Sequence, residues 1–351
     1  MSSDMKKSNS QEPLLIENDV DLSAFNTFGF FCRASRLVRV RSVEDVCTVI
    51  AHPELGRLPR FILGGGSNIV LTGDVSALVV KVEVPGLELV EVREDAWIVE
   101  AGAGESWHGL VEWTLARGLP GLENLALIPG TVGAAPVQNI GAYGMELAER
   151  FESLDAVDLD TGHTLTLDRN ECRFGYRDSV FKHEAAGAFL ITRVRLRLPR
   201  PWQPVLGYPD LASMPEESGN LAPTPSEIFD RVCQVRRAKL PDPAEFGNAG
   251  SFFKNPVISS RQFRALIERE PSIVHYPLPG GDHKLAAGWL IEVCGWKGRS
   301  LGRAAVYDRQ ALVLVNRGGA SGHEVMALAA AIQESVFDRF GIRLESEPIV
   351  L

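Results

Sequence analysis

A long uncharged segment rich in small residues runs from residue 128 to residue 144 and contains glycine, alanine, proline and asparagine. A loop exposed to solvent would be more polar. Backbone without bulky side chains can lie close against a large, flat and partly apolar ligand. We therefore expect residues 128–144 to form one wall of a binding site.

A second glycine-rich turn, residues 64–68, directly follows the apolar residues 61–63, which favour a buried strand. Successive backbone N–H groups in such a turn form a concave site for an anion, and Ser67 and Asn68 add side-chain donors. Taken alone, a turn of this kind is more often a plain tight turn. Together with residues 128–144, it favours one dinucleotide held between two structural units.

Residues 102–107 resemble the start of a Rossmann fingerprint, because Gly102 and Gly104 follow an expected strand and open an expected helix. Trp107 stands where the third glycine of that fingerprint would be. The third glycine permits close packing of helix on strand, which an indole ring prevents. A strand-to-helix turn with Trp107 in the core is therefore favoured over a Rossmann site.

The composition excludes several classes of protein. The formal net charge of −9 disfavours nucleic acid as the main partner. The cysteines are widely separated and the histidines lack metal-ligand spacing, so we expect no metal and a reducing cytoplasm. No apolar run reaches the roughly 18 residues of a membrane span, so we expect no membrane insertion. The Gly-x-Ser-x-Gly elbow is absent, and a hydrolase is the least supported enzyme class.

Capping signals and apolar periodicity predict an α+β chain of several units. Ser42 begins one expected helix, Thr224 with Glu227 begins a second, and Ser321 begins a third that Gly341 ends. The expected division is a loose tail over 1–20, units over 21–85, 86–222 and 223–341, and a segment 342–351 that packs back on the first unit.

Ordered sequence blocks then identify a resemblance. They are residues 26–29 (NTFG), 64–68 (GGGSN), 121–130 (GLENLALIPG), 138–144 (QNIGAYG), 172–179 (CRFGYRDS), 239–243 (KLPDP), 247–256 (GNAGSFFKNP) and 284–291 (KLAAGWLI). In this order, over about residues 21–351, they resemble the type I UDP-N-acetylenolpyruvoylglucosamine reductase family, also called UDP-N-acetylmuramate dehydrogenases. The resemblance implies three domains. Two of them form a vanillyl-alcohol-oxidase-like (PCMH-type) unit for non-covalent FAD, and an α+β C-terminal domain binds the substrate.

The implied activity is NADPH- and FAD-dependent reduction of UDP-N-acetylglucosamine enolpyruvate to UDP-N-acetylmuramate for peptidoglycan synthesis. Hydride goes from the reduced flavin to the enolpyruvyl CH₂, and Ser251 gives a proton to the adjacent carbon. Arg177 would stabilise the substrate carboxylate, and Glu347 would assist there. On residue type alone, a surface arginine, a turn serine and an exposed terminal glutamate are each more common, and Glu345 is the alternative to Glu347.

The resemblance also implies binding residues. Those for the cofactor are Gly64, Gly65, Gly66, Ser67, Asn68, Pro129, Gly130, Gly133, Ala134, Asn139, Gly141, Ala142 and Tyr143. Those for the UDP-sugar or nicotinamide are Tyr208, Lys239, Asn255, Lys284 and Gln310. Core packing of Tyr143 is as well supported by residue type as a role at the cofactor. Plain surface exposure of Lys239 is as well supported as substrate binding. Ile349 is a departure, since relatives often have arginine there. We expect a monomer.

Two other functions remain open from the residues. A related FAD oxidase with another substrate would keep the first two units but would not need Ser251, Lys239 or the third domain. A non-catalytic flavin- or nucleotide-binding module would not need Arg177, Ser251 or Glu347. NADPH bleaching of a yellow protein, followed by reoxidation by the enolpyruvyl sugar, separates these alternatives.

Overall fold

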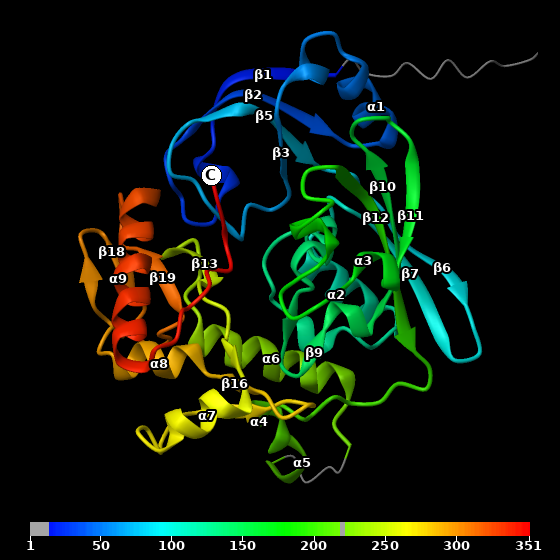
Figure 1. Ribbon diagram of the computed structural model, residues 1–351. Helices are drawn as coiled ribbons and strands as arrows, with labels where there is room; N and C mark the ends of the chain where they lie inside the picture. The colour runs from blue at the N-terminus through cyan, green and yellow to red at the C-terminus, as the bar shows by residue number, and fades with distance from the viewer. Residues whose placement is uncertain (1–13, 218–221) are drawn as a thin grey trace, which may run out of the picture.

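The computed structural model describes residues 14–217 and 222–351 and combines several sheets with flanking helices (Figure 1). Residues 1–13, most of the expected loose tail, lie outside the described part. Residues 16–20 do not belong to a tail, because they form most of strand β1 (Ile16–Asp21). Ile16 and Val20 are half-buried there and pair with the next strand, which the short apolar pattern did not reveal.

The first unit is a sheet in the order β1-β2-β5-β3, with strands β2, β5 and β3 parallel. Its elements are β2 (Arg33–Val40), α1 (Val43–Ala51), β3 (Arg60–Leu63), β4 (Ile69–Val70) and β5 (Val75–Val82). Val38 and Val80 enter one hydrophobic core, and Leu37 and Val79 enter another. Because successive side chains of a strand point to opposite faces, both faces of this sheet are buried.

The second unit is an antiparallel sheet in the order β11-β10-β12-β7-β6, seen at the right of Figure 1. Its regular elements are β6 (Leu87–Val92), β7 (Ala96–Gly102), α2 (Trp107–Ala116), β8 (Gly141–Ala142), β9 (Met145–Glu146), β10 (Phe151–Asp158), β11 (Thr164–Asp168), α3 (Arg169–Cys172) and β12 (Phe189–Pro199). Trp107 is buried and donates from Nε1 to the Leu125 carbonyl at 2.9 Å. The expectation of a core tryptophan at this turn is confirmed.

The remaining elements hold two small sheets and the longest helix. They are α4 (Pro209–Ala212), α5 (Met214–Glu217), α6 (Pro225–Lys239), β13 (Gly247–Ser251), β14 (Val257–Ile258), α7 (Ser260–Ile267), β15 (His275–Pro277), β16 (His283–Leu285), α8 (Ala287–Val293), β17 (Ser300–Leu301), β18 (Ala304–Val306), β19 (Val313–Asn316), α9 (Gly322–Phe340) and β20 (Ile349–Val350). The sheet orders are β13-β19-β18-β17 and β14-β16-β15. Helix α6, expected to open the third unit, buries Ile228 and Val232 in a core that also contains residues of the first two units.

The C-terminal segment returns to the first unit and runs between the two halves of the molecule in Figure 1. Strand β20 pairs in parallel with β4, and Ile349 donates from its amide to the Asn68 carbonyl at 3.0 Å. Just before it, Ser346 forms a bridge with Phe253. This segment therefore joins the glycine turn at residues 64–68 to the segment that follows Ser251. Among the described residues, no helix has the length and apolar character that crossing a bilayer requires.

Candidate active site

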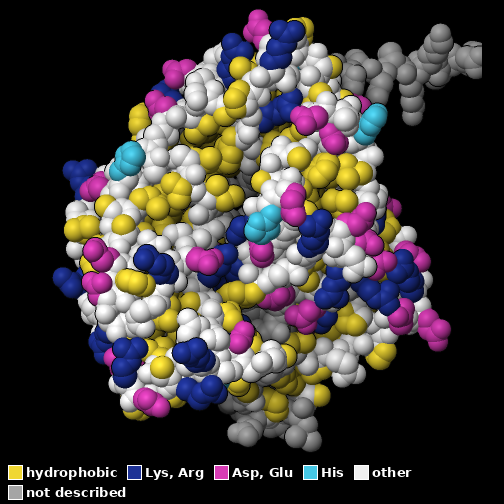
Figure 2. Space-filling view, in the orientation of Figure 1, with side chains coloured by type: hydrophobic (Ala, Val, Ile, Leu, Met, Phe, Trp, Pro, Cys, Tyr) yellow, Lys and Arg dark blue, Asp and Glu magenta, His cyan; other side chains and the backbone are white. Residues whose placement is uncertain are grey.

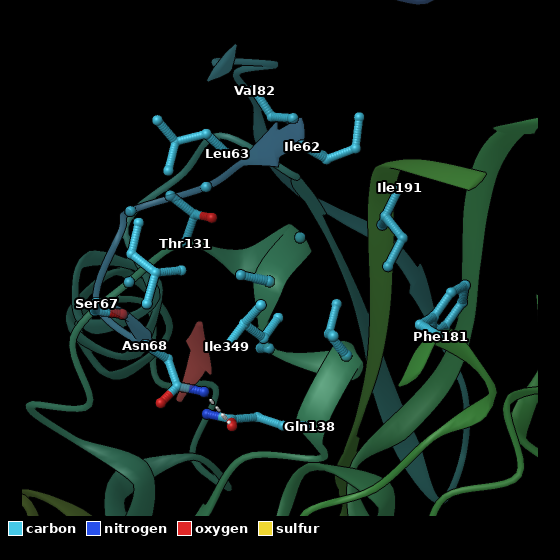
Figure 3. A pocket seen from close by; sticks show the side chains of 18 of the residues that line it. Ile62, Leu63, Ser67, Asn68, Val82, Thr131, Gln138, Phe181, Ile191 and Ile349 are labelled. Carbon is cyan, nitrogen blue, oxygen red and sulfur yellow. Dashed lines mark hydrogen bonds between the residues drawn. The ribbon is translucent and has the colours of Figure 1, made fainter. Parts of the chain in front are cut away.

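A cavity of about 320 Å³ lies between the first two units (Figure 3). The first unit contributes residues 60–69, and the second contributes residues 129–131, 133–135 and 137–138 with the 3-10 turn η7 (Val180–Lys182) and β12. Glu347, Ile349 and Leu351 of the C-terminal segment complete the wall. Most of the lining is apolar, as expected for a site that holds a flat ring system.

The two glycine-rich segments lie in direct contact. A Cβ atom on Gly65 would be 2.7 Å from Gly130 Cα, and one on Gly64 would be 2.6 Å from Thr131 Oγ1. Ser67 donates from its hydroxyl to the Pro129 carbonyl at 3.1 Å. Glycine is therefore needed at these positions for the close approach of two loops.

The residues at this contact fit a phosphate-bearing dinucleotide. In the described chain, no hydrogen bond to protein is found from the amides of Gly65, Gly66, Ser67 and Asn68. The Thr131 hydroxyl is buried and has no partner among the described residues. Free donors of this kind, next to an apolar cavity, suit an anion and a flat ring together. FAD has both parts, so these residues could hold it.

Part of the expected cofactor set lies outside the cavity lining. Asn139 is buried and its amide group is fully used, since it donates to Glu146 Oε2 and the Gly175 carbonyl and accepts from the Ala148 amide. Tyr143 packs its ring edge-on against Tyr208, with centroids 5.1 Å apart. Gly141 and Ala142 form strand β8, whose Gly141 carbonyl accepts from Arg177. Their expected role at FAD stays a prediction.

Arg177 and Glu347 form an ion pair, with 2.8 Å between Nε and Oε1. Arg177 adopts a left-handed backbone conformation, with φ of 54°. Its Nη2 donates to the Gly141 carbonyl at 2.7 Å. A Cβ on Gly141 would be 3.0 Å from Arg177 Nη1, so glycine there leaves room for the guanidinium. The guanidinium is thus held on one edge, and Nη1 has no protein acceptor among the described residues.

Glu347 is held by its backbone as well as by Arg177. Its amide donates to the Phe252 carbonyl at 2.8 Å, and its carbonyl accepts from Asn68 Nδ2 at 3.3 Å. Its side chain is only 9% exposed, and burial raises the pKa of the carboxyl, although the charges of Arg177 and Lys182 oppose this. Glu345, the alternative by register, is 74% exposed in its side chain and pairs with Lys254. The geometry therefore brings Glu347 to Arg177, and Glu345 to the surface.

Ser251 ends strand β13 next to Phe252, whose carbonyl accepts from the Glu347 amide. Within the described chain, its hydroxyl has no hydrogen-bond partner, and its side chain is half-buried. Gly250 before it has φ of 70°, and the rings of Phe252 and Phe253 after it are buried. Ser251 is thus one residue from the backbone contact that anchors Glu347.

The expected substrate residues fall into two groups. Lys239 contacts both carboxylate oxygens of Asp210 at 2.7 Å, and Tyr208 lies just before helix α4, which contains that aspartate. Asn255 and Gln310 lie at the start of helix α8, where Asn255 Oδ1 accepts from the Ala287 amide and Gln310 Oε1 would be 3.2 Å from a Cβ on Gly288.

Lys284 and Arg177 lie near the same aromatic ring. Its Nζ is 4.7 Å from the Tyr176 ring centroid, and the Arg177 guanidinium is 5.3 Å from the same centroid. Burial raises the pKa of Tyr176. The structure therefore brings Lys284 near Arg177, whereas Lys239 lies beside α4.

Sequence reasoning missed Lys182, Gln138 and Arg236. Lys182 lines the cavity and donates from Nζ to the Arg177 carbonyl at 3.1 Å. Gln138 accepts from Asn68 Nδ2 at 2.6 Å, which links the two glycine-rich segments (Figure 3). Gln138 lies inside the QNIGAYG block and could have been singled out there, but no sequence pattern pointed to Lys182 or Arg236.

Around the middle of the face in Figure 2, acidic and basic side chains gather beside a hollow.

Comparison with known proteins agrees with this site. Residues 34–168 match the model of an FAD binding domain, and residues 242–351 match the C-terminal domain of UDP-N-acetylenolpyruvoylglucosamine reductase. The chain is 60% identical over 341 residues to the UDP-N-acetylenolpyruvoylglucosamine reductase of Azoarcus sp. strain BH72, covering 96% of this chain and 98% of that protein. Identity is 59% to the Paraburkholderia phytofirmans reductase, over 94% and 96% of the two chains.

A solved structure of a UDP-N-acetylenolpyruvylglucosamine reductase is also similar to this chain. The crystal structure of UDP-N-acetylenolpyruvylglucosamine reductase from Thermus caldophilus superposes with a TM-score of 0.67 at 27% sequence identity. The match covers 96% of this chain and 99% of that one. The similarity therefore extends over the FAD-binding part and the C-terminal part alike.

Proposed function

The chain belongs to the UDP-N-acetylenolpyruvoylglucosamine reductase family, and from this we propose that Arg177, Ser251 and Glu347 form its reaction centre. The enzyme reduces the enolpyruvyl ether of UDP-N-acetylglucosamine, with FAD as cofactor and NADPH as co-substrate. Bound FAD supplies the chemistry of hydride transfer from NADPH to the enolpyruvyl CH₂. The protein must bind the substrate carboxylate, protonate the neighbouring carbon and keep water out.

Arg177 binds the substrate carboxylate. Its Nε and Nη2 are occupied by Glu347 and the Gly141 carbonyl, which orient the planar group and leave Nη1 for an incoming anion. A guanidinium in a fixed orientation stabilises negative charge that spreads into a carboxylate. Lysine at this position would lose the fork geometry.

Glu347 acts beside it as a hydrogen-bond donor. Burial raises the pKa of its carboxyl, which favours the protonated form. Its Oε1 lies 2.8 Å from Arg177 Nε, and when its other oxygen holds a proton, that oxygen donates a hydrogen bond to the substrate carboxylate, which an ionised carboxyl would repel. The proposal rests on the position of Glu347. Its side chain is buried against Arg177, and its amide donates to the Phe252 carbonyl.

Ser251 donates the proton to the carbon next to the carboxylate. Its hydroxyl has no hydrogen-bond partner in the described chain, so it is free to face a substrate. The positive charges of Lys182 and Lys254 both act on nearby Glu347, so the region also favours the negative serine oxygen that remains. General acid catalysis of this kind contributes about 10²- to 10⁴-fold to a rate.

The test is a two-step anaerobic experiment. NADPH is added to bleach the yellow protein, and the enolpyruvyl sugar is then added while reoxidation is followed by absorbance. Ser251→Ala should bleach normally and reoxidise about 10²- to 10⁴-fold more slowly. Normal reoxidation in this variant would remove Ser251 from the proposal.

Matched controls are available in the chain. Ser300→Ala changes an exposed serine on β17, and Glu345→Gln changes the exposed neighbour of Glu347. Both should reoxidise as the wild type does, and Glu347→Gln should be slowed. Equal slowing by Glu345→Gln and Glu347→Gln would contradict the assignment to Glu347.

We also propose unit boundaries near residues 85 and 222, with strand β1 as part of the first unit, a monomeric state and a cytoplasmic location. Limited proteolysis, light scattering and cell fractionation test these three proposals directly.

A further inference from the structure

Arg177 lies at the tip of a tight two-residue turn. The amides of Gly175 and Asp178 each donate to the carbonyl of the other, at 3.0 and 3.2 Å, and close the turn. Tyr176 and Arg177 lie between them, and Arg177 has a φ of 54°. A positive φ at the second position of a turn is the usual place of glycine or asparagine. An arginine keeps this conformation only where the surrounding structure enforces it.

Lys182 binds the carbonyl at the tip of this turn. Its Nζ donates to the Arg177 carbonyl at 3.1 Å, and no other donor reaches that carbonyl in the described chain. Glu347 and the Gly141 carbonyl act at the far end of the same residue, because they bind its guanidinium. The lysine therefore adds a second anchor to the peptide that follows Arg177, whose amide already bonds across the turn.

The segment that contains Lys182 is itself firmly attached to the cavity wall. Lys182 is the last residue of η7, in which Val180 and Phe181 are buried. Just before η7, Ser179 donates from its hydroxyl to the carbonyl of Val137, which lines the cavity. The stem of the lysine thus starts from a fixed position, so its ammonium can hold the turn in place.

An ion pair does not account for a cation at this position. Lys182 is half-buried, and it pairs with no carboxylate within residues 14–217 and 222–351. Burial lowers the pKa of its ammonium, and the charge of Lys254 lowers it further, against the effect of more distant carboxylates. A charge taken out of water is costly unless its donors are used. The acceptor that Lys182 uses is the carbonyl at the tip of the turn.

We propose that Lys182 is a positioning residue for the reduction, which fixes the turn at Arg177 and thereby aims the guanidinium at the substrate carboxylate. This inference rests on the proposed function, because it takes Arg177 as the group that binds this carboxylate. Without the ammonium, the peptide that follows Arg177 can rotate and the left-handed conformation can relax, which moves the start of the side chain. A displacement of about 1 Å at a site of this kind can cost on the order of 10²-fold in rate.

The experiment uses the FAD-loaded enzyme in the same two-step anaerobic assay. K182M keeps an apolar stem but removes the ammonium, and K182A removes both. In each variant the maximal rate of reoxidation by the enolpyruvyl sugar should fall about 10- to 100-fold, whereas bleaching by NADPH should proceed as in the wild type. K297M changes a lysine that pairs with Glu292 outside the cavity lining, and it should be normal in both steps.

Two results of this assay would overturn the inference. One is wild-type reoxidation in K182M. The other is equal slowing of bleaching and reoxidation, which would mean that the ammonium acts on the flavin itself. If only one of the two Lys182 variants folds and retains FAD, that variant decides the outcome.

A double-variant cycle separates positioning of Arg177 from a direct effect of charge. If Lys182 acts through Arg177, K182M should slow the reoxidation of R177M by less than about twofold, because residues that act as a unit are not additive. If the ammonium acted by its charge on Glu347 or Ser251, K182M would slow R177M by the full 10- to 100-fold that we expect in the wild-type background. That result would overturn the inference.

The single variants distinguish this inference from the proposed function. R177M should itself reoxidise more slowly than the wild type. Wild-type reoxidation by R177M would overturn both the assignment of Arg177 and this inference. Slow reoxidation by R177M, together with wild-type reoxidation by K182M, would overturn this inference alone.

Discussion

The contact between Gly65 and Gly130 makes a quantitative prediction for the variant Gly65→Ala. A Cβ on Gly65 would be 2.7 Å from Gly130 Cα, whereas ordinary contacts lie at 3.4–4 Å, so the loops would have to separate by about 0.7 Å to reach an ordinary contact. The obstructing atom belongs to the backbone and has no rotamer that would relieve the contact. Overpacking of this kind costs about 1–3 kcal/mol.

The cost should appear mainly as weaker FAD binding, because the same contact shapes the cavity. Since 1.4 kcal/mol is tenfold in a binding constant, the dissociation constant of FAD should rise about 5- to 150-fold. Quenching of flavin fluorescence on titration of the apoprotein measures it. Gly73→Ala is the matched control, because a Cβ there meets nothing within 4 Å. Wild-type FAD affinity and stability in Gly65→Ala would refute the assignment of this contact to the cofactor site.

Further predictions concern a carboxyl, a lysine and a tryptophan. Burial raises the pKa of Glu347 above its ordinary value of 4.5, so the native state keeps a proton that the unfolded state has lost, and stability falls as pH rises from about 4.5. Glu347→Gln lacks this titration. In urea unfolding of the apoproteins, the free energy of unfolding of Glu347→Gln should therefore increase relative to that of the wild type as pH rises. A relative decrease with pH would contradict the raised pKa. Lys239→Ala should change the free energy of unfolding by less than about 1 kcal/mol, because its pair with Asp210 is half-exposed, but should raise the KM for the UDP-sugar; an unchanged KM would argue against binding by Lys239. Trp107→Phe should cost about 2–4 kcal/mol in denaturant unfolding, because the Leu125 carbonyl loses its donor and a void remains; a neutral result would contradict the core assignment.

Local signals in the sequence predicted much of the fold. Ser42 caps helix α1, Thr224 and Glu227 form the capping box of α6, and Gly341 ends α9 in a left-handed conformation. These features depend on residues a few positions apart, which a single sequence displays. Strand β1 was missed because its burial depends on pairing with β2, and its own apolar residues are few.

The candidate site was predicted less completely, for a physical reason. The glycine turn 64–68 and Arg177 lie in sequence blocks, Glu347 was expected from the family resemblance, and the structure brings Arg177 to Glu347. Lys182 and Arg236 were not singled out, because a basic residue on a helix or turn is usually a surface charge. Only the packing of distant segments shows that Arg236 is buried without an ion-pair partner among the described residues. The same packing places Glu345 at the surface, whereas sequence spacing alone could not distinguish Glu345 from Glu347.

The return of the C-terminal segment to the glycine turn has a consequence for assembly. Asn68 contacts the Glu347 carbonyl across 279 residues of sequence. Closing a loop of that length costs roughly 5 kcal/mol of chain entropy, and contacts so distant in sequence form late in folding. The wall containing Glu347, Ile349 and Leu351 is therefore completed only after the intervening elements have folded. Bound flavin is accordingly a reporter of complete maturation, and the first two units produced alone would retain it poorly.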